Sequence, residues 1–261
     1  MSGALIVSSN FSDNDAVEMH ILTMSEDFHV PRNQILAALI PEDYQRLTPH
    51  LERVYLNAGI ILSEPGEAMT EVYFPDSAMI SLVSIMEDGS TTEIAIVGNE
   101  GMVGLPVLLG GEATTSCAMV QISGVVIKLD ANIIKQEFHQ GGELQRLLLL
   151  YTQALLTQVS QNAACNRQHT IVERLSRWLL SVQNCVKKDE LPLTQEFISQ
   201  MLGIRRSGVT VAAGTLQKAG IIRYSRGKIT IVNQEDLEAT ACECYRVVEK
   251  EFARLLNLDK S

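Results

Sequence analysis

The sequence predicts an α+β protein in which a jelly-roll barrel, of the double-stranded β-helix type, precedes a long helix and a C-terminal winged helix-turn-helix. Three observations predict this order. Short runs of β-forming residues, separated by turn dipeptides, fill residues 59–129. A leucine-rich helical segment follows from about Gly142. Beyond Pro192, two helical patterns flank a glycine and are followed by two short strands.

The barrel is predicted from six short runs rich in β-branched and aromatic residues. Pro-Gly, Asp-Gly, Gly-Asn and Gly-Gly dipeptides separate the runs. Many short strands at such spacing are typical of a small barrel or jelly roll. The six runs are Ile60–Leu62, Val72–Phe74, Met79–Ile85, Glu93–Val97, Ala118–Ile122 and Val125–Leu129.

The segments around the barrel differ in character. Residues 1–30 are mostly polar or acidic, contain no Lys or Arg, and are expected to form a mobile tail that starts at either Met1 or Met24. Pro31–Leu56 is expected to be helical. The expected division is 1–30 as tail, 31–141 as barrel domain, 142–167 as dimerisation helix, 168–247 as DNA-binding domain and 248–261 as C-terminal tail.

The long helix is predicted to hold two copies of the chain together. Residues 147–166 contain no charged residue, but five amide side chains within them argue against a membrane span. Residues at steps of four, three and four form the a/d seam of a coiled coil. A helix packed only on its own barrel is the alternative. The predicted dimer contacts are Leu144, Leu148, Tyr151, Leu155, Gln158 and Asn162.

Residues 193–216 have the pattern of a helix-turn-helix. Thr194 can cap the first helix, and Gly203 permits the left-handed turn that ends it. The second helix is predicted to begin near Arg205. Two strands, Ile221–Tyr224 and Ile229–Val232, follow with a tight turn between them. Two strands in this position form a wing.

The charge distribution singles out the same region. The chain carries a net charge of −10, which taken alone disfavours nucleic-acid binding. Between Leu193 and Val232, however, six basic residues accompany a single acid, Glu196, so this module carries +5. We therefore expect double-stranded DNA to dock on it. The alternative is a small-molecule or cyclic-nucleotide sensor whose winged domain contacts other proteins.

Positions within the basic module indicate separate roles. Residues early on the second helix enter the major groove, whereas wing residues hold phosphates. An arginine that contacts guanine with two hydrogen bonds contributes roughly 1–3 kcal/mol of discrimination. The predicted DNA-contacting residues are Thr194, Arg205, Arg206, Ser207, Thr210, Arg223, Arg226 and Lys228.

The order of parts resembles the Crp/Fnr family of bacterial transcription regulators over about residues 33–247. Glu64–Glu67, Val97–Gly104 and Thr194–Leu216 carry the resemblance. It implies a homodimer on a palindromic operator, an effector or partner that acts at the barrel, and RNA polymerase as a further partner. Arg206, Ser207 and Val211 stand where the best-known members have Arg-Glu-x-x-x-Arg, so a different operator is expected.

The barrel sequence departs from the cyclic-AMP-binding members of that family. Those members hold the phosphate with a Gly-Glu helix and an Arg-Ser pair, whereas Met102 stands at the glutamate position and Thr115–Ala118 contains no arginine. Between Val54 and Ile127 there are nine acids and no Lys, Arg or His. A buried phosphate needs a cation or several well-aimed donors. We therefore expect no cyclic nucleotide, and an unknown effector that is not anionic.

No cofactor, metal ion or catalytic activity is expected. Cys242 and Cys244 form a C-x-C pair, but no second ligand pair lies nearby in the sequence. The oxygen-sensing members use N-terminal cysteines for iron and sulfur, and none precedes Cys117. No phosphate loop, metal-ligand helix or nucleophile elbow occurs, so we expect no enzyme. An odd cysteine count without an export signal favours a reduced, cytoplasmic protein.

Overall fold

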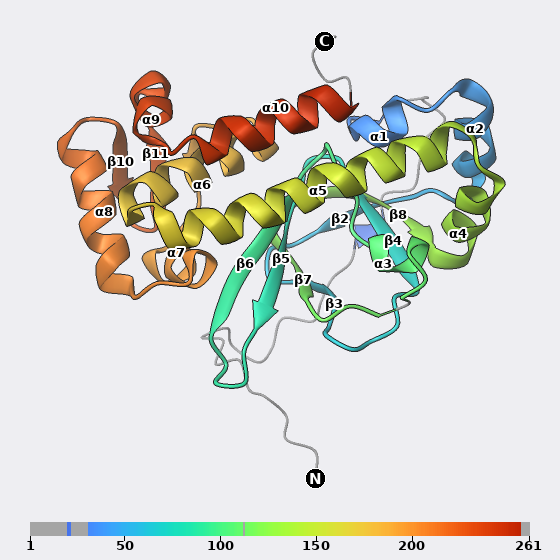
Figure 1. The fold of residues 1–261 in the computed structure, drawn as a ribbon, viewed down its shortest axis with the longest axis horizontal. Coiled ribbons are helices and arrows are strands. Elements are labelled where there is room, and N and C mark those ends of the chain that lie inside the picture. The colour runs from blue at the N-terminus through green and yellow to red at the C-terminus, as the bar shows by residue number, and fades with distance from the viewer. Residues whose placement is uncertain (1–19, 22–30, 112, 257–261) are drawn as a thin grey trace.

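Two four-stranded antiparallel sheets form the first domain of the computed structural model, which describes residues 20–21, 31–111 and 113–256 (Figure 1). In spatial order, the first sheet contains β1 (His20–Ile21), β2 (Glu52–Leu56), β8 (Gly124–Asp130) and β4 (Glu71–Pro75). The second contains β3 (Ile61–Ser63), β7 (Cys117–Ile122), β5 (Met79–Ile85) and β6 (Thr91–Val97). The antiparallel β domain expected from the sequence is confirmed.

The barrel interior is filled by side chains from alternate strand positions. Such alternation is the period-2 pattern of strands with one buried face. An apolar cluster inside the barrel draws its residues from both sheets. They include Val54, Ile80, Val97, Val120 and Val126, each completely buried.

The helical segment expected over Pro31–Leu56 ends earlier than predicted. Two short helices, α1 (Gln34–Ala37) and α2 (Pro41–Leu47), are followed by a 3-10 turn, η1 (Thr48–His50), and then by strand β2. The expectation was therefore wrong for Glu52–Leu56, which pairs along its whole length with β8. Pairing with a strand some seventy residues later is a tertiary effect that outweighs a local helical pattern.

Asn33 fixes α1 to the barrel. Its side-chain oxygen accepts a hydrogen bond from the Leu36 amide at 3.2 Å and so caps the helix. Its amide group donates to the carbonyls of Pro75 at 3.0 Å and Gly101 at 2.9 Å. This buried asparagine satisfies three polar groups and joins three separate segments.

Helix α4 (Ala131–Gln140) leads into the long helix α5 (Gly142–Gln168), which crosses the front of the molecule in Figure 1. One face of α5 packs on the barrel through Leu147 and Leu148, which are buried. No helix in the described part of the chain is long and apolar enough to cross a membrane.

The C-terminal domain is built around helix α6 (Ile171–Val186). Helix α8 (Arg206–Lys218) packs against it, helix α7 (Gln195–Leu202) packs against α8 and β6, and a three-stranded sheet completes the domain. That sheet contains β10 (Ile222–Ser225), β11 (Lys228–Ile231) and β9 (Glu190–Leu191), in this order. The two predicted wing strands are present, and β9 is an additional strand that the short Glu-Leu segment did not reveal.

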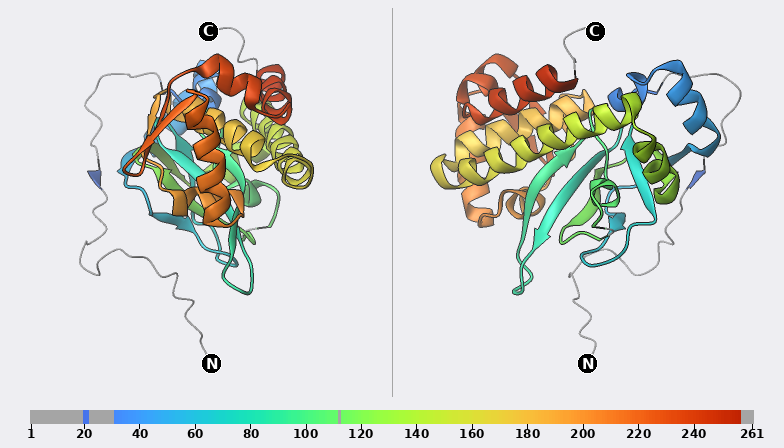
Figure 2. Two further views of the ribbon diagram at one scale, coloured as in Figure 1. Left: turned by 90° about the vertical axis from the view of Figure 1, so that its left-hand side faces the viewer. Right: turned by 45° about the vertical axis from the view of Figure 1, so that its right-hand side comes forward.

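Residues 248–256, expected to belong to a C-terminal tail, are helical, and residues 257–261 lie outside the described residues. After α9 (Gln234–Thr240), helix α10 (Cys244–Leu256) runs back beside α5 (Figure 2). Phe252 meets Tyr151 edge to face at 6.3 Å, and Leu255 and Leu256 are buried. Phe252, Leu255 and Leu256 therefore belong to the core under α5. The tail expected for residues 1–30 lies outside the described residues, apart from β1.

Candidate functional site

The helix-turn-helix has the local geometry that the sequence predicted. The Thr194 hydroxyl accepts a hydrogen bond from the Phe197 amide at 3.2 Å and caps α7. Gly203 ends α7 in the left-handed conformation, with φ of 61°. Arg205 precedes α8 in extended backbone. These features fix the angle between α7 and α8.

The first turns of α8 present polar side chains to solvent. Val209, Ala212 and Ala213 lie on the buried face of the helix. The predicted contact residues on the opposite face are Arg205, Arg206, Ser207 and Thr210, all exposed. This amphipathic arrangement is what a recognition helix needs, because its N-terminal residues must reach base edges.

Gln195 belongs to this surface and was missed from the sequence. The Thr210 hydroxyl lies 3.0 Å from Gln195 Oε1 and 3.1 Å from the Arg206 carbonyl. Gln195 occupies the first turn of α7, close in space to the start of α8. A glutamine after a helix cap carries no distinctive sequence signal, so only the fold brings it to this surface.

The wing ends in a tight turn that displays basic residues. Arg226 and Gly227 both have positive φ, 49° and 75°, as a type I′ hairpin turn requires. Arg223 and Arg226 are exposed. Lys228 is exposed as well but pairs with Glu190 of β9 at 2.7 Å. One of the predicted phosphate contacts is thus already engaged by an acid.

Contacts with the barrel position the helix-turn-helix. The buried guanidinium of Arg174 on α6 donates to the Leu202 carbonyl at the C-terminal end of α7. Gly203 lies against Thr92 of β6, so closely that a Cβ at this position would lie 2.6 Å from the Thr92 hydroxyl oxygen. The turn between α7 and α8 therefore lies directly against β6.

The predicted dimer seam on α5 lies inside a single chain. Leu144, Leu148, Tyr151 and Asn162 are buried, and the Gln158 side chain accepts a hydrogen bond from the Ile96 amide at 2.8 Å. Leu155 packs on the same core. Four of the six residues are thus buried within the chain's own fold, which argues against a partner contact there, whereas Leu155 and Gln158 are only partly buried.

A second heptad stripe on α5 is open to solvent. Leu149 is 50% exposed and Leu156 is 62% exposed. Gln153, Ser160 and Ala163 are exposed as well. These five residues, called the α5 stripe below, are spaced by four, three, four and three positions, as in a coiled-coil seam.

The barrel segment that resembles a phosphate site is packed and hydrogen-bonded. Met102, at the glutamate position of the family, is buried in the core under α5, and its carbonyl accepts a hydrogen bond from the Tyr151 hydroxyl at 3.1 Å. The amides of Gly101 and Val103 donate to the carbonyls of Gly98 and Tyr73. These two donors are therefore not directed at a ligand.

The two cations that flank the barrel sequence are paired with acids. Arg53 lies 2.9 Å from Asp76, and Lys128 lies 2.9 Å from Glu71 and 3.0 Å from Glu52. Neither is available to neutralise an anion inside the barrel without breaking these pairs. The sequence argument that the barrel lacks a cation for an anionic ligand therefore extends to Arg53 and Lys128, which flank residues 54–127.

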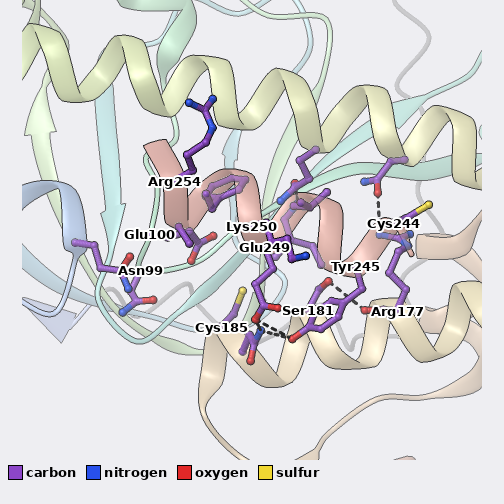
Figure 3. Close-up of a pocket in the computed structure, with 18 of the residues that line it drawn as sticks. Asn99, Glu100, Arg177, Ser181, Cys185, Cys244, Tyr245, Glu249, Lys250 and Arg254 are labelled. Carbon is purple, nitrogen blue, oxygen red and sulfur yellow. Dashed lines mark hydrogen bonds between the residues drawn. The ribbon is translucent and has the colours of Figure 1, made fainter. Parts of the chain in front are cut away.

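A cavity of about 640 Å³ lies where the two domains meet (Figure 3). Ile96 of β6, Gln158 of α5, Ser181 of α6 and Tyr245 of α10 all line it. Burial raises the pKa of the Glu100 carboxyl in its wall. A ligand in this cavity would contact both domains and the C-terminal helix together.

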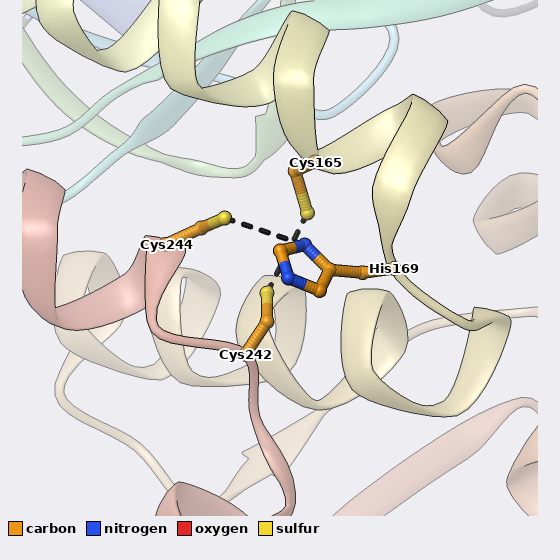
Figure 4. A group of neighbouring side chains, drawn as sticks. All are labelled: Cys165, His169, Cys242 and Cys244. Atoms are coloured by element: carbon orange, nitrogen blue, oxygen red, sulfur yellow. Dashed lines mark hydrogen bonds between the residues drawn. The ribbon is translucent and has the colours of Figure 1, made fainter.

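Four metal-ligating side chains meet beside that cavity (Figure 4). Cys165 and His169 come from the end of α5, and Cys242 and Cys244 from the segment where α10 begins. The three cysteines are buried. A hydrogen bond from the Cys242 thiol holds the pKa of the Cys165 thiol below its ordinary value. The second ligand pair that the sequence seemed to lack is therefore present in the fold.

An antiparallel β domain, a long helix and a winged helix-turn-helix with a basic outer face together define a DNA-binding transcription regulator. Two family models match the chain in this order. The cyclic nucleotide-binding domain matches residues 53–140, and the Crp-like helix-turn-helix domain matches residues 173–240. The chain therefore belongs to the Crp/Fnr family, and the resemblance inferred from its sequence is confirmed.

Solved structures with the same fold come from several bacteria. A Crp/Fnr-family regulator from Eubacterium rectale is 18% identical, with a TM-score of 0.63 over 77% of this chain and 94% of that chain. FixK2 from Bradyrhizobium japonicum is 17% identical, with a TM-score of 0.63 over 74% and 98%. The c-di-GMP-responsive regulator CLP from Xanthomonas campestris is 12% identical, with a TM-score of 0.61 over 74% and 99%. A comparison with curated proteins gave no significant match.

Proposed function

We propose that the protein regulates transcription as a homodimer on a palindromic operator, with α8 in the major groove of each half-site. The exposed start of α8 carries this proposal. Arg205, Arg206, Ser207 and Arg226 are exposed. The first three would reach base edges, and Arg226 of the wing would hold a phosphate. The net charge of −15 outside the basic module restricts docking to this face.

The α5 stripe supports the dimer. Two exposed leucines one heptad apart, Leu149 and Leu156, would be buried by the same stripe of a second copy in a two-fold arrangement. Each fully buried leucine contributes about 1.5–3 kcal/mol. Both recognition helices would then belong to one symmetric unit, which matches an inverted-repeat operator.

The regulatory input differs from a cyclic-AMP switch in this proposal. Three features disfavour a buried phosphate. Met102 lies in the core, the amides of Gly101 and Val103 already donate to backbone carbonyls, and Arg53 and Lys128 are paired with acids. The effector is accordingly a non-anionic ligand or a partner protein. RNA polymerase is the expected partner at the promoter, the cytoplasm the expected location, and no catalytic step is required.

Selection of the full chain on random DNA duplexes tests the operator. We expect enrichment of an inverted repeat with half-sites one helical turn or a multiple apart, and binding that weakens steeply with salt. The double variant Arg205→Ala/Arg206→Ala should lose this enrichment. Arg46→Ala, which removes a cation on α2 of the barrel domain, is the matched control. Recovery of duplexes with no common sequence would favour the alternative of a winged domain that contacts proteins.

A further inference from the structure

The ends of two helices that are far apart in sequence bring three thiols and one imidazole together. Cys165 and His169 are one helical turn apart, so both side chains lie on the same face at the end of α5. Cys242 and Cys244 lie on both sides of Glu243: Cys242 belongs to the segment after α9, and Cys244 is the first residue of α10. The three sulfurs and the nearest imidazole nitrogen of this cluster all lie within 4.8 Å of one another.

We propose that Cys165, His169, Cys242 and Cys244 bind a single divalent zinc-type ion that fastens the start of α10 to the end of α5. Three cysteines and one histidine form a common ligand set for structural zinc. The site is separate from the DNA interface and from the barrel, and this inference does not depend on the operator or effector proposed above.

The distances fit one tetrahedral ion. Zinc–sulfur bonds of about 2.3 Å and zinc–nitrogen bonds of about 2.0–2.1 Å place neighbouring ligand atoms roughly 3.5–3.8 Å apart. Cys165 Sγ lies 3.5 Å from Cys242 Sγ, and Cys244 Sγ lies 3.5 Å from His169 Nδ1. Only small shifts would centre all four on one ion. An iron–sulfur cluster is also held by four ligands, but these are shared among several irons and would therefore lie farther apart.

A carboxylate orients the imidazole for this role. His169 Nε2 lies 3.2 Å from Glu243 Oε2, so the other ring nitrogen, Nδ1, is left facing the sulfurs. Histidines that bind metals almost always donate their second N–H to such a partner. The side chain of Gln161 adds a second outer contact, because its amide group donates to Cys244 Sγ at 3.2 Å.

Two buried arginines balance the charge of the site. Three thiolates around one divalent ion carry a net charge of −1, which is costly to bury without a cation. Arg174 and Arg177 are buried on α6 and interact electrostatically with Cys165. Among the described residues, neither arginine Nε atom has a hydrogen-bond partner. A metal–thiolate centre gives these cations a role.

The site lies at the joint between the two domains. His169 ends α5, and α6 begins two residues later behind a capping box formed by Thr170 and Glu173. A bound ion would therefore hold the joint between α5 and α6 together with α10. The Cys165 and Cys242 sulfurs lie 3.5 Å apart and are not joined in a disulfide, in which they would lie about 2.05 Å apart.

Metal analysis and cobalt substitution of the full chain test the site. We expect one zinc ion per chain after purification without chelators. Stripped protein titrated with Co²⁺ should show thiolate-to-cobalt charge transfer and the strong visible bands of a tetrahedral centre. Wild-type protein that holds no metal and gives no such bands would overturn the proposal. So would a Cys165–Cys242 disulfide found by mass spectrometry in protein purified without metal or reductant.

Variants with matched controls assign the ligands. Cys165→Ser and Cys244→Ser should abolish the charge-transfer band. Glu243→Gln, which leaves all four ligands in place, should weaken Co²⁺ binding by roughly 10–100-fold. Cys117→Ser and Glu249→Gln are the controls, because these residues lie outside the cluster. The proposal fails if Cys117→Ser loses as much metal as Cys165→Ser, or if Glu243→Gln binds cobalt as tightly as Glu249→Gln.

Discussion

Trp178 on α6 donates its indole N–H to the Glu93 carboxylate on β6 at 2.7 Å, and both side chains are buried. This hydrogen bond joins the DNA-binding domain to the barrel. The Ser81 hydroxyl donates to the same carboxylate. Burial nevertheless raises the pKa of Glu93 to about 7. A carboxyl group between the two domains therefore titrates near neutral pH.

The stability of the protein should decline between about pH 4.5 and pH 7 because of Glu93. In this range the unfolded chain releases the proton while the folded protein keeps it, and above pH 7 both states are ionised. The difference amounts to at most about 3 kcal/mol. Glu93→Gln should remove this slope in urea unfolding measured across the range. Glu87→Gln, on the exposed β5–β6 hairpin, should keep the wild-type slope; an unchanged slope in Glu93→Gln would contradict the assignment.

Gly203→Ala should destabilise the protein for two separate reasons. Its left-handed φ of 61° costs a residue with a side chain roughly 1–2 kcal/mol, and the new methyl group would clash with Thr92. Thr92→Ala removes the two nearest side-chain atoms. In the double variant it should relieve the clash and restore that part of the stability, but the cost of the left-handed backbone should remain. Urea unfolding of the two single variants and the double variant measures this coupling.

Gly214→Ala is the matched control for that experiment. Gly214 lies within α8, and nothing lies within 4 Å of the Cβ it would gain. The substitution should stabilise the protein by about 0.5–1 kcal/mol, because alanine favours helix. Equal destabilisation by the two glycine substitutions would show that neither the turn nor Thr92 makes Gly203 special.

Local patterns predicted most of the fold, and contacts distant in sequence account for the errors. The cap at Thr194, the glycine turn and the wing depend on neighbouring residues, and all are present. Strand β2 and helix α10 were missed because each is stabilised by a distant partner, β8 and α5. The leucine-rich α5 has two heptad stripes, and the sequence could not say which one faces the barrel.

The candidate sites follow the same division. The basic residues of α8 and the wing are close in sequence, so a charge count located them. The cysteine–histidine cluster joins residues 77 positions apart, as the pair Cys165 and Cys242 shows, so spacing alone suggested no metal. Burial of Glu93 by Trp178, 85 positions away, is equally invisible in a single sequence.

Leu156→Asp should convert the proposed dimer into a monomer. Leu156 is the most exposed leucine of the α5 stripe, and a carboxylate there would meet its symmetry mate in a seam that buries apolar surface. Sedimentation equilibrium measures the mass of the assembly. The operator affinity should fall when the dimer is lost. Gln136→Asp, on the exposed face of α4, should leave both unchanged. A Leu156→Asp dimer of wild-type affinity would place the interface elsewhere.

Cyclic AMP and cyclic GMP should give no binding heat in calorimetry, which corresponds to dissociation constants weaker than about 1 mM. Met102 fills the position of the phosphate-binding glutamate, and Arg53 and Lys128 are held by acids. Arg53→Ala would distinguish specific from adventitious binding. Micromolar binding that is lost in this variant would show that the Arg53–Asp76 pair opens to receive the phosphate.

Arg206→Ala and Lys228→Ala should weaken DNA binding in different ways. In the proposed complex Arg206 reads a base, so its loss should cost about 1–3 kcal/mol on the selected operator and little on unrelated DNA. Lys228 is proposed to hold a phosphate, so its loss should weaken binding to all sequences and reduce the salt slope by about one unit. Glu190 competes for Lys228 at 2.7 Å, so Glu190→Gln should strengthen binding to all sequences. Fluorescence anisotropy on operator and scrambled duplexes at several salt concentrations separates the two effects. If Arg206→Ala lost equal affinity on both duplexes, Arg206 would not be a base-reading residue.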